Sequence, residues 1–186
     1  MSSGRFLSLP PRFPPMMVHA RALTGLGRVT EAAAEARRAF AAVTSSGAAV
    51  HPRAVLFPLA EIEFRAGHID DALAILEQGL TRIREVGQRI EESNFLRLKA
   101  EALLAKDPTN HRQAEECMRS AIDITQQLSG KSYELRAATD LARLLRDTGR
   151  RDEARALLAQ IYGWFTEGFE TQDLRDAKAL LKELGG

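Results

Sequence analysis

The side chains that could carry out chemistry are few in this sequence, and their spacing argues against catalysis. Gly130-Lys131-Ser132 matches the last residues of a phosphate-binding loop. Such a loop needs another glycine five residues before its second glycine, where this chain has Thr125, and it needs a preceding strand, where this chain has a helical pattern. We therefore interpret these residues as a turn between two helices, with Ser132 as the N-cap of the second.

Metal-ligating and acid–base residues are also dispersed. The carboxylate pairs Glu61/Glu63 and Glu91/Glu92 are expected on solvated faces or in first helical turns, because acid–base catalysis needs two carboxylates that converge in a pocket. Cys117 is the single cysteine and lies in a helical apolar pattern, which is typical of a small buried hydrophobe. No two histidines lie four residues apart on one predicted helix; they are His19, His51, His68 and His111. The sequence therefore predicts no enzyme, no metal site and no cofactor.

Composition limits the class of partner. The 186 residues include 26 basic and 25 acidic side chains, and this balance argues against a dedicated nucleic-acid-binding protein. No apolar run approaches the roughly 18 residues that span a bilayer. Residues 1–15 are rich in proline and lack an apolar signal core, so we expect a flexible lead-in rather than a targeting peptide. One cysteine and no signal peptide fit a cytoplasmic location.

An internal repeat organises the rest of the chain. Glycine followed by an acidic residue and alanine recurs in Gly27–Ala32, Gly67–Ala72 and Gly149–Ala154, with a degenerate copy at Asn110–Ala114. The alanines Ala32, Ala72, Ala114 and Ala154 are 40, 42 and 40 residues apart, and twelve residues before them stand Ala20, Ala60, Ala102 and Ala142. Glycine ends one helix at low conformational cost, and the alanines let two antiparallel helices approach closely.

The repeat predicts an all-α, right-handed α-solenoid of four helical hairpins over residues 16–170, resembling tetratricopeptide (TPR) repeats, with a capping helix over 171–186. Thr171 or Asp173 would cap that last helix, and Trp164, Tyr162, Phe165 and Phe169 would form a hydrophobic joint before it. The predicted first helices of the pairs are 16–25, 53–66, 91–105 and 132–147. The predicted second helices are 29–44, 69–86, 111–128 and 151–166.

The C-terminal half also resembles a more specific group. The stretches Gly130–Ala138 and Leu141–Leu144, then Tyr162–Thr171, Asp173-Leu174 and Ala177–Leu181, are similar to the C-terminal repeat region of bacterial signalling proteins. Those proteins carry a predicted AAA/STAND-type ATPase, often with a cyclase or a transcriptional activator domain. The resemblance implies a sensor arm that associates with an ATPase or an output domain. Neither of those domains fits within this chain, so neither activity transfers to it.

In tetratricopeptide arrays, partners bind the concave groove lined by the first helix of each pair. The alanine register places the following residues there: Phe57, Glu61, Phe64 and Arg65; Leu96, Lys99, Leu103 and Lys106; and Arg136, Thr139, Arg143 and Arg146. We call the set Lys99, Lys106, Arg136, Thr139, Arg143 and Arg146 the basic strip. It predicts a groove for an acidic peptide or an acidic face of a companion domain, because arginine grips carboxylates with two hydrogen bonds. The alternative is an ordinary solvated helix face.

The sequence thus favours a scaffold or sensor module for protein–protein interaction. Two alternatives stay open. One is a regulatory C-terminal arm of a STAND ATPase, cyclase or transcriptional regulator, and the other is a repeat module that senses a small molecule.

Overall fold

The computed structural model describes residues 15–47 and 51–185 of the chain, and in these ranges it holds helices and no strand. The first helices of the pairs are α1 (Pro15–Gly25), α3 (Phe57–Arg65), α5 (Arg89–Lys106) and α7 (Lys131–Asp147). The second helices are α2 (Val29–Ser45), α4 (Ile69–Val86), α6 (His111–Gln127) and α8 (Arg151–Tyr162). α9 (Gln172–Gly185) ends the array, and a π-helical turn, η1 (Pro52–Leu56), leads into α3. The prediction of an all-α repeat solenoid is confirmed.

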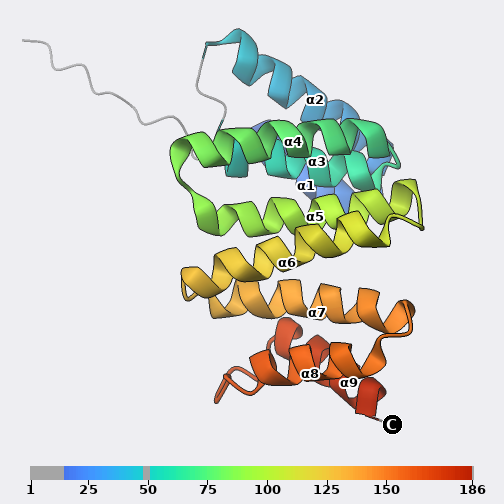
Figure 1. Cartoon of the computed structure of the whole chain (residues 1–186). Helices are drawn as coiled ribbons and strands as arrows, with labels where there is room; N and C mark the ends of the chain where they lie inside the picture. The colour runs from blue at the N-terminus through green and yellow to red at the C-terminus, as the bar shows by residue number, and fades with distance from the viewer. Residues whose placement is uncertain (1–14, 48–50, 186) are drawn as a thin grey trace, which may run out of the picture.

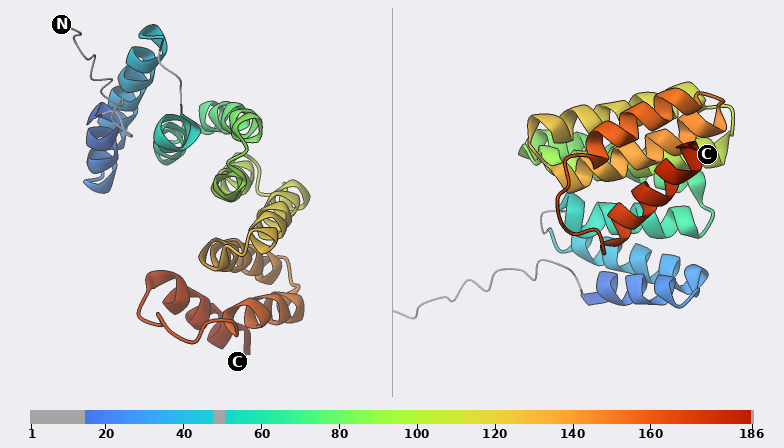
Figure 2. Two further views of the ribbon diagram at one scale, coloured as in Figure 1. Left: turned by 90° about the vertical axis from the view of Figure 1, so that its left-hand side faces the viewer. Right: turned by 90° about the horizontal axis from the view of Figure 1, so that it is seen from below.

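From α5 to α8 the helices stack in chain order, below the first two hairpins, as Figure 1 shows. Viewed end-on they follow an arc, with α1, α3, α5, α7 and α9 along its inner side and α4, α6 and α8 along its outer side (Figure 2, left). The inner helices contact one another in succession, α1 with α3, α3 with α5, α5 with α7 and α7 with α9. None of the helices in the described ranges is long and apolar enough to cross a membrane.

The repeat residues have the structural role that the sequence predicts. All eight register alanines, Ala20, Ala32, Ala60, Ala72, Ala102, Ala114, Ala142 and Ala154, are completely buried. Gly67 and Gly149 follow the first helix of their pairs with φ of 82°, a left-handed conformation that glycine adopts without strain. Close helix packing and tight turns therefore both follow from the repeat.

Two hydrophobic clusters form the core. One runs through the array from Leu56 to Leu184 and is built mainly of leucine, isoleucine and alanine. The other belongs to the first hairpin and the start of the second, and alanine supplies much of it: Met17, Ala20, Leu23, Ala32, Ala33, Ala36, Ala39, Ala54, Val55, Leu59 and Ile62. Within each cluster, neighbouring helices of the solenoid share one interior.

Some local predictions are wrong. The helix predicted over 151–166 ends at Tyr162, and α7 begins at Lys131 after Gly130, so Ser132 lies inside the helix and is not its N-cap. The segment predicted as one helix over 53–66 begins as a π-helix. Its Phe57 N–H donates to the Pro52 carbonyl, and the next residue, Pro58, has no N–H to donate.

Glu63, expected on a solvated face, is buried instead, and Glu91 and Glu92, which lie in the first turn of α5 as expected, are buried as well. Glu63, Glu91 and Glu92 are between 1% and 8% exposed. Each is paired with an arginine of an earlier segment: Arg37 of α2 with Glu63 at 2.6 Å, Arg53 of η1 with Glu91 at 2.7 Å and Arg84 of α4 with Glu92 at 2.7 Å. An ion pair offsets the cost of burying a carboxylate, so these charges join successive elements rather than facing water.

Candidate partner-binding surface

The inner side of the arc has a row of alternating charges across α3, α5 and α7. On α3, Arg65 pairs with Glu61 at 3.2 Å. Between α5 and α7, Arg97 Nε donates to Asp140 at 2.6 Å, and Arg143 pairs with the same carboxylate at 3.0 Å. Both partners of each of these pairs belong to inner helices, so no side chain of an outer helix takes part in these pairs.

Glu101 stands in this row as a carboxylate with neither hydrogen bond nor ion pair among the described residues. Its side chain reaches solvent, yet protein surrounds it closely enough that burial raises its pKa above the usual range. The negative charge of Asp140 raises this pKa further, while the nearby arginines lower it without cancelling the rise. Those arginines are Arg65, Arg97 and Arg143, and each of them already has an acidic partner.

The structure divides the basic strip between two sides of the array. Lys99 pairs with Glu77 of α4 at 2.5 Å, and Lys106 pairs with Asp70 of the same helix at 2.7 Å. Both lysines therefore face an outer helix rather than α7. Of the apolar residues predicted with them, Leu96 is buried and Leu103 is half-buried.

A two-residue shift in α5 accounts for this division. Ala100, which is also completely buried, lies 40 residues after Ala60, and Glu101 then follows it as Glu61 follows Ala60. α5 continues to Lys106, six residues past Ala100, whereas α3 and α7 end five residues past Ala60 and Ala142. The turn from α5 to α6, residues 107–110, is also one residue longer than the turns 66–68 and 148–150 that follow α3 and α7. Counting back twelve residues from Ala114, as in the other repeats, therefore reaches Ala102, whereas the residue that corresponds to Ala60 in the structure is Ala100. The 40-residue spacing of Glu61 and Glu101 is the sequence signal that identifies Glu101.

The α7 residues of the strip remain together, and α9 occupies part of their face. Arg136 Nε donates to Asp173 at 2.7 Å, and Arg146 pairs with Glu183 at 3.1 Å, so both ends of α9 are held by arginines of α7. Thr139 is buried, and its hydroxyl donates to the Leu135 carbonyl at 2.7 Å. Thr139 therefore offers no polar group to a partner.

The predicted aromatic groove residues on α3 serve mainly in packing. Phe57 is half-buried and contacts Phe95 with ring centroids 5.1 Å apart, and Phe64 packs on the main core. At the other end of the array the predicted aromatic joint holds only in part. Tyr162 and Phe165 pack on the core, but Trp164 is 65% exposed, with the Lys131 ammonium 4.3 Å from its ring centroid.

One group of side chains has the composition of a metal site. Ligand atoms of Glu63, His68 and Asp71 lie within 4.8 Å of one another. The Arg37 guanidinium is already bound there, with Nε 2.6 Å and Nη2 2.7 Å from the Glu63 carboxylate and Nη2 3.0 Å from His68 Nδ1. A cation of the protein thus fills this position, and the group joins α2 to the second hairpin.

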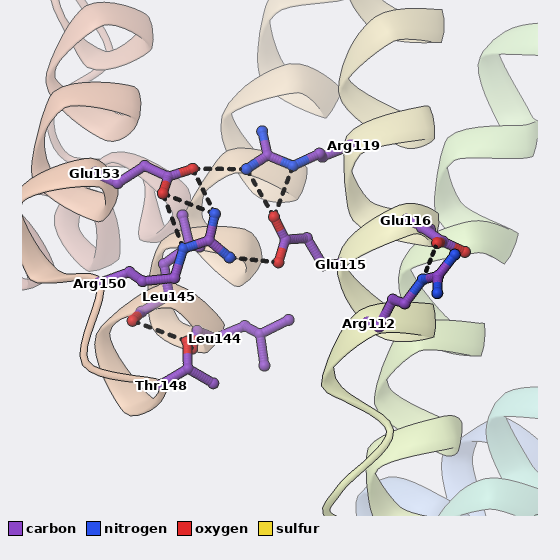
Figure 3. A network of polar contacts seen from close by, with 9 residues as sticks. All are labelled: Arg112, Glu115, Glu116, Arg119, Leu144, Leu145, Thr148, Arg150 and Glu153. Atoms are coloured by element: carbon purple, nitrogen blue, oxygen red, sulfur yellow. Dashed lines mark hydrogen bonds and ion pairs between the residues drawn. The ribbon is translucent and has the colours of Figure 1, made fainter.

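On the outer side, α6 and α8 are joined by a network of four charges (Figure 3). Arg119 contacts Glu115 and Glu153 at 2.7 Å each, and Arg150 contacts Glu115 at 2.6 Å and Glu153 at 2.7 Å. Burial raises the pKa of Glu115, but the hydrogen bonds from Arg150 and Arg119 outweigh it, so the net shift is downward. The shallow hollow beside this network is lined by charged residues that already have partners, Arg112, Glu115, Glu116 and Arg119. These ion pairs therefore hold neighbouring repeats together.

The half-buried Cys117 has a thiol whose pKa is raised by burial, which makes it a poor nucleophile.

Comparison with known proteins agrees with the fold. A tetratricopeptide-repeat family model matches residues 135–161, which lie in α7 and α8. No curated protein sequence matches the chain.

Solved structures with TPR-like repeats superpose on most of the chain. One, from a Podosopora anserina protein assigned as a kinesin light chain with nearly identical TPR-like repeats, has a TM-score of 0.74 at 21% identity and covers 91% of this chain and 82% of its own. BtubC (BKLC) from P. vanneervenii has a TM-score of 0.68 at 17% identity, covering 91% and 77%. A thermophilic TPR protein from Thermus thermophilus has a TM-score of 0.61 at 18% identity, covering 91% and 79%. At these identities the likeness establishes the fold alone.

Proposed function

We propose that the chain is a protein-interaction scaffold, acting in the cytoplasm, that binds a segment of a partner protein along the inner side of its arc. The observation that supports this most is Glu101, an exposed carboxylate without a hydrogen bond or ion pair in the described ranges, set among arginines that are already paired. A partner group that donates to this carboxylate would gain a charge-assisted hydrogen bond at little cost in desolvation. The proposal assigns binding to the chain rather than catalysis.

The test compares an inner-side variant with an outer-side control. Immobilised wild type, Glu101→Lys and Arg112→Glu would be exposed to the same bacterial lysate, and retained proteins would be identified by mass spectrometry. Arg112 is a suitable control because its side chain is 92% exposed on α6, an outer helix. We expect the inner-side variant to lose a specific protein that wild type and control both retain. Equal retention by all three proteins contradicts the proposal.

The acidic-partner form of this proposal concerns Arg136, Arg143 and Arg146. Each already binds a carboxylate of this chain, so an acidic segment must compete with Asp173, Asp140 or Glu183 for its arginine. Binding should then weaken steeply as salt is added. Two labelled peptides of equal length, one acidic and one basic, would be titrated by fluorescence anisotropy against wild type and Arg143→Glu. Stronger binding of the basic peptide contradicts the acidic-partner form but leaves the scaffold proposal intact.

The sensor-arm alternative rests on the resemblance of residues 130–184, the part that forms α7, α8 and α9. Its test is to sequence the neighbouring reading frames. An ATPase or an output domain in frame supports it, and unrelated genes on both sides contradict it. The small-molecule alternative is tested by native mass spectrometry of the purified chain, where a retained ligand would appear as added mass.

A further inference from the structure

The two edges of the array differ in their exposed side chains. At one edge, on the left in Figure 1, α5 and α7 begin and α4, α6 and α8 end. α1 begins on the same side, which is also on the left in the right-hand view of Figure 2. The opposite edge holds the turns within the pairs, residues 26–28, 66–68, 107–110 and 148–150.

Apolar side chains are exposed mainly at the first edge. Of the seven large apolar side chains that are exposed in the described ranges, only Leu26 lies at the opposite edge. The other six, which we call the apolar edge, are Met16 and Val18 in the first turn of α1, Val86 and Leu128 where α4 and α6 end, and Trp164 and Phe169 between α8 and α9. Single exposed apolar residues are normal, but their accumulation on one side of a protein marks a contact surface.

The most exposed member of the apolar edge is Trp164. It is 65% exposed, although the Lys131 ammonium lies 4.3 Å from its ring centroid. Phe169 is 44% exposed, although its ring contacts that of Tyr162 with centroids 6.0 Å apart. The contacts within the described chain therefore leave both rings open to a further apolar group.

Residues 1–14 join the array at the apolar edge, because α1 begins at Pro15. The flexible lead-in predicted from the sequence falls on them and so lies outside the described residues. Trp164 lies beside the start of α7, whose first residue is Lys131. From α1 to α7 there are three steps between neighbouring inner helices, of about 8–10 Å each, which is at most about 30 Å. Phe6 is nine residues before Pro15, and nine residues of extended chain also span about 30 Å.

The charges of this segment and of the exposed rings' surroundings are complementary. Residues 1–14 contain two arginines and no acidic residue. Residues 163–171, which carry both exposed rings, contain Glu167 and Glu170 and no basic residue. Both glutamates are exposed and have no hydrogen bond or ion pair among the described residues. One of the arginines, Arg5, directly precedes an aromatic ring, so this stretch offers both groups that the edge leaves without a partner.

We propose that Arg5, Phe6 and Leu7 lie against the apolar edge of the same molecule, with Phe6 on Trp164 and Arg5 paired with a glutamate of residues 163–171. Residues 8–14 then run along the edge from α7 back to α1. The prolines in this stretch favour an extended chain, which lowers the conformational entropy lost on binding. The segment joins the first repeat to the last. It uses no residue of the inner row, so the inference is independent of the proposed function.

Trp164 is the only tryptophan of the chain, so its fluorescence reports on this contact in the full-length protein. Acrylamide quenching is measured for wild type, Phe6→Ser and Phe13→Ser. The last is a matched control, because position 13 is two residues before Pro15 and cannot reach the ring. We expect Phe6→Ser to raise the quenching constant about twofold, since covering half of the exposed ring halves the area that the quencher reaches. Equal constants in wild type and Phe6→Ser, or an equal rise in Phe13→Ser, overturn the proposal.

A second pair of variants tests the charge, and the protein concentration identifies which molecule supplies the segment. Arg5→Glu should raise the quenching constant, and Arg12→Glu, which makes the same change closer to α1, should not. A segment tethered to its own array has an effective concentration in the millimolar range, so the wild-type constant should not change between about 1 and 100 µM protein. A constant that falls as the concentration rises means that a second copy supplies the segment, and this overturns the proposal. Circular dichroism melts verify that all variants remain folded.

Discussion

At the scale of single residues, α4 and α5 approach each other closely at Gly79. This glycine is buried in the middle of α4, and a Cβ placed on it would lie 2.0 Å from Cε1 of Phe95. Phe95 is 1% exposed and its ring also contacts that of Phe57, so it has little room to move. The sequence alone would read this glycine as a weak point of a helix, whereas the structure requires it.

We expect Gly79→Ala to destabilise the protein by about 1–3 kcal/mol, because over-packing outweighs the gain of up to about 1 kcal/mol in helix propensity. The control is Gly25→Ala, where a Cβ meets nothing within 4 Å. That variant should be neutral or slightly stabilising. Urea titration followed by circular dichroism measures both, and a Gly79→Ala variant as stable as wild type would show that the α4–α5 contact is looser than described.

For Glu101 we predict that removal of the side-chain charge does not lower the melting temperature. Because burial and Asp140 raise its pKa in the folded state, the folded protein binds this proton more tightly than the unfolded chain does. Its charge therefore lowers stability above the folded pKa, and this penalty disappears as pH falls below the unfolded value of about 4.3. Glu101→Gln should melt at the same or a higher temperature than wild type at neutral pH, with the difference shrinking toward pH 4.

Thermal melts across this pH range, with Glu116→Gln as the control, measure the effect. Glu116 is an exposed residue of α6 whose side chain pairs with Arg112, so its removal should not stabilise the protein. A Glu101→Gln variant that melts below wild type at neutral pH would mean that the carboxylate has a stabilising partner in the folded protein.

At the scale of helices, the sequence predicts most elements because glycine turns and buried alanines leave a clear period. The start and end of α4, Ile69 and Val86, coincide with the prediction. What periodicity could not reveal is the longer turn after α5, since two alanines two residues apart, Ala100 and Ala102, are both buried. Nor could it show that Glu63 is buried, because its partner Arg37 lies 26 residues earlier in the chain.

α9 is the element whose removal should matter most. Its Leu174, Leu180 and Leu184 are at most 4% exposed, and burial of such a side chain contributes roughly 1.5–3 kcal/mol. Ending the chain at Glu170 would uncover apolar surface on α7 and α8 and remove the ion pairs of Arg136 with Asp173 and of Arg146 with Glu183. We expect a lower melting temperature and association through the exposed end, measured by differential scanning calorimetry and light scattering. An unchanged melt with a monodisperse monomer contradicts a capping role for α9.

At the scale of the whole molecule, the proposed binding surface is formed by several repeats together. No single helix makes a site here: the inner row draws Glu61 and Arg65 from α3, Arg97 and Glu101 from α5, and Asp140 and Arg143 from α7. The sequence could predict that such a row exists, because the repeat places one helix of each pair on the inner side. It could not predict which charges neutralise one another, since the pair that joins α5 to α7, Arg97 with Asp140, spans 43 positions and depends on the register of α5.

The two ends of the array should also differ in local stability. The core of the first hairpin is built largely of alanine, while the main cluster contains leucine and isoleucine through α4 to α9. Each buried methylene contributes about 0.8 kcal/mol, so an alanine-rich hairpin gains less from packing than a leucine-rich one. Because repeats contact only their neighbours, the array can open from its weaker end without unfolding elsewhere.

Hydrogen exchange measured by mass spectrometry should therefore show faster exchange in α1 and α2 than in α5, α6 and α7. Uniform protection from α1 to α9 would mean that the chain unfolds as one cooperative unit and that its alanine-rich end is as stable as its centre.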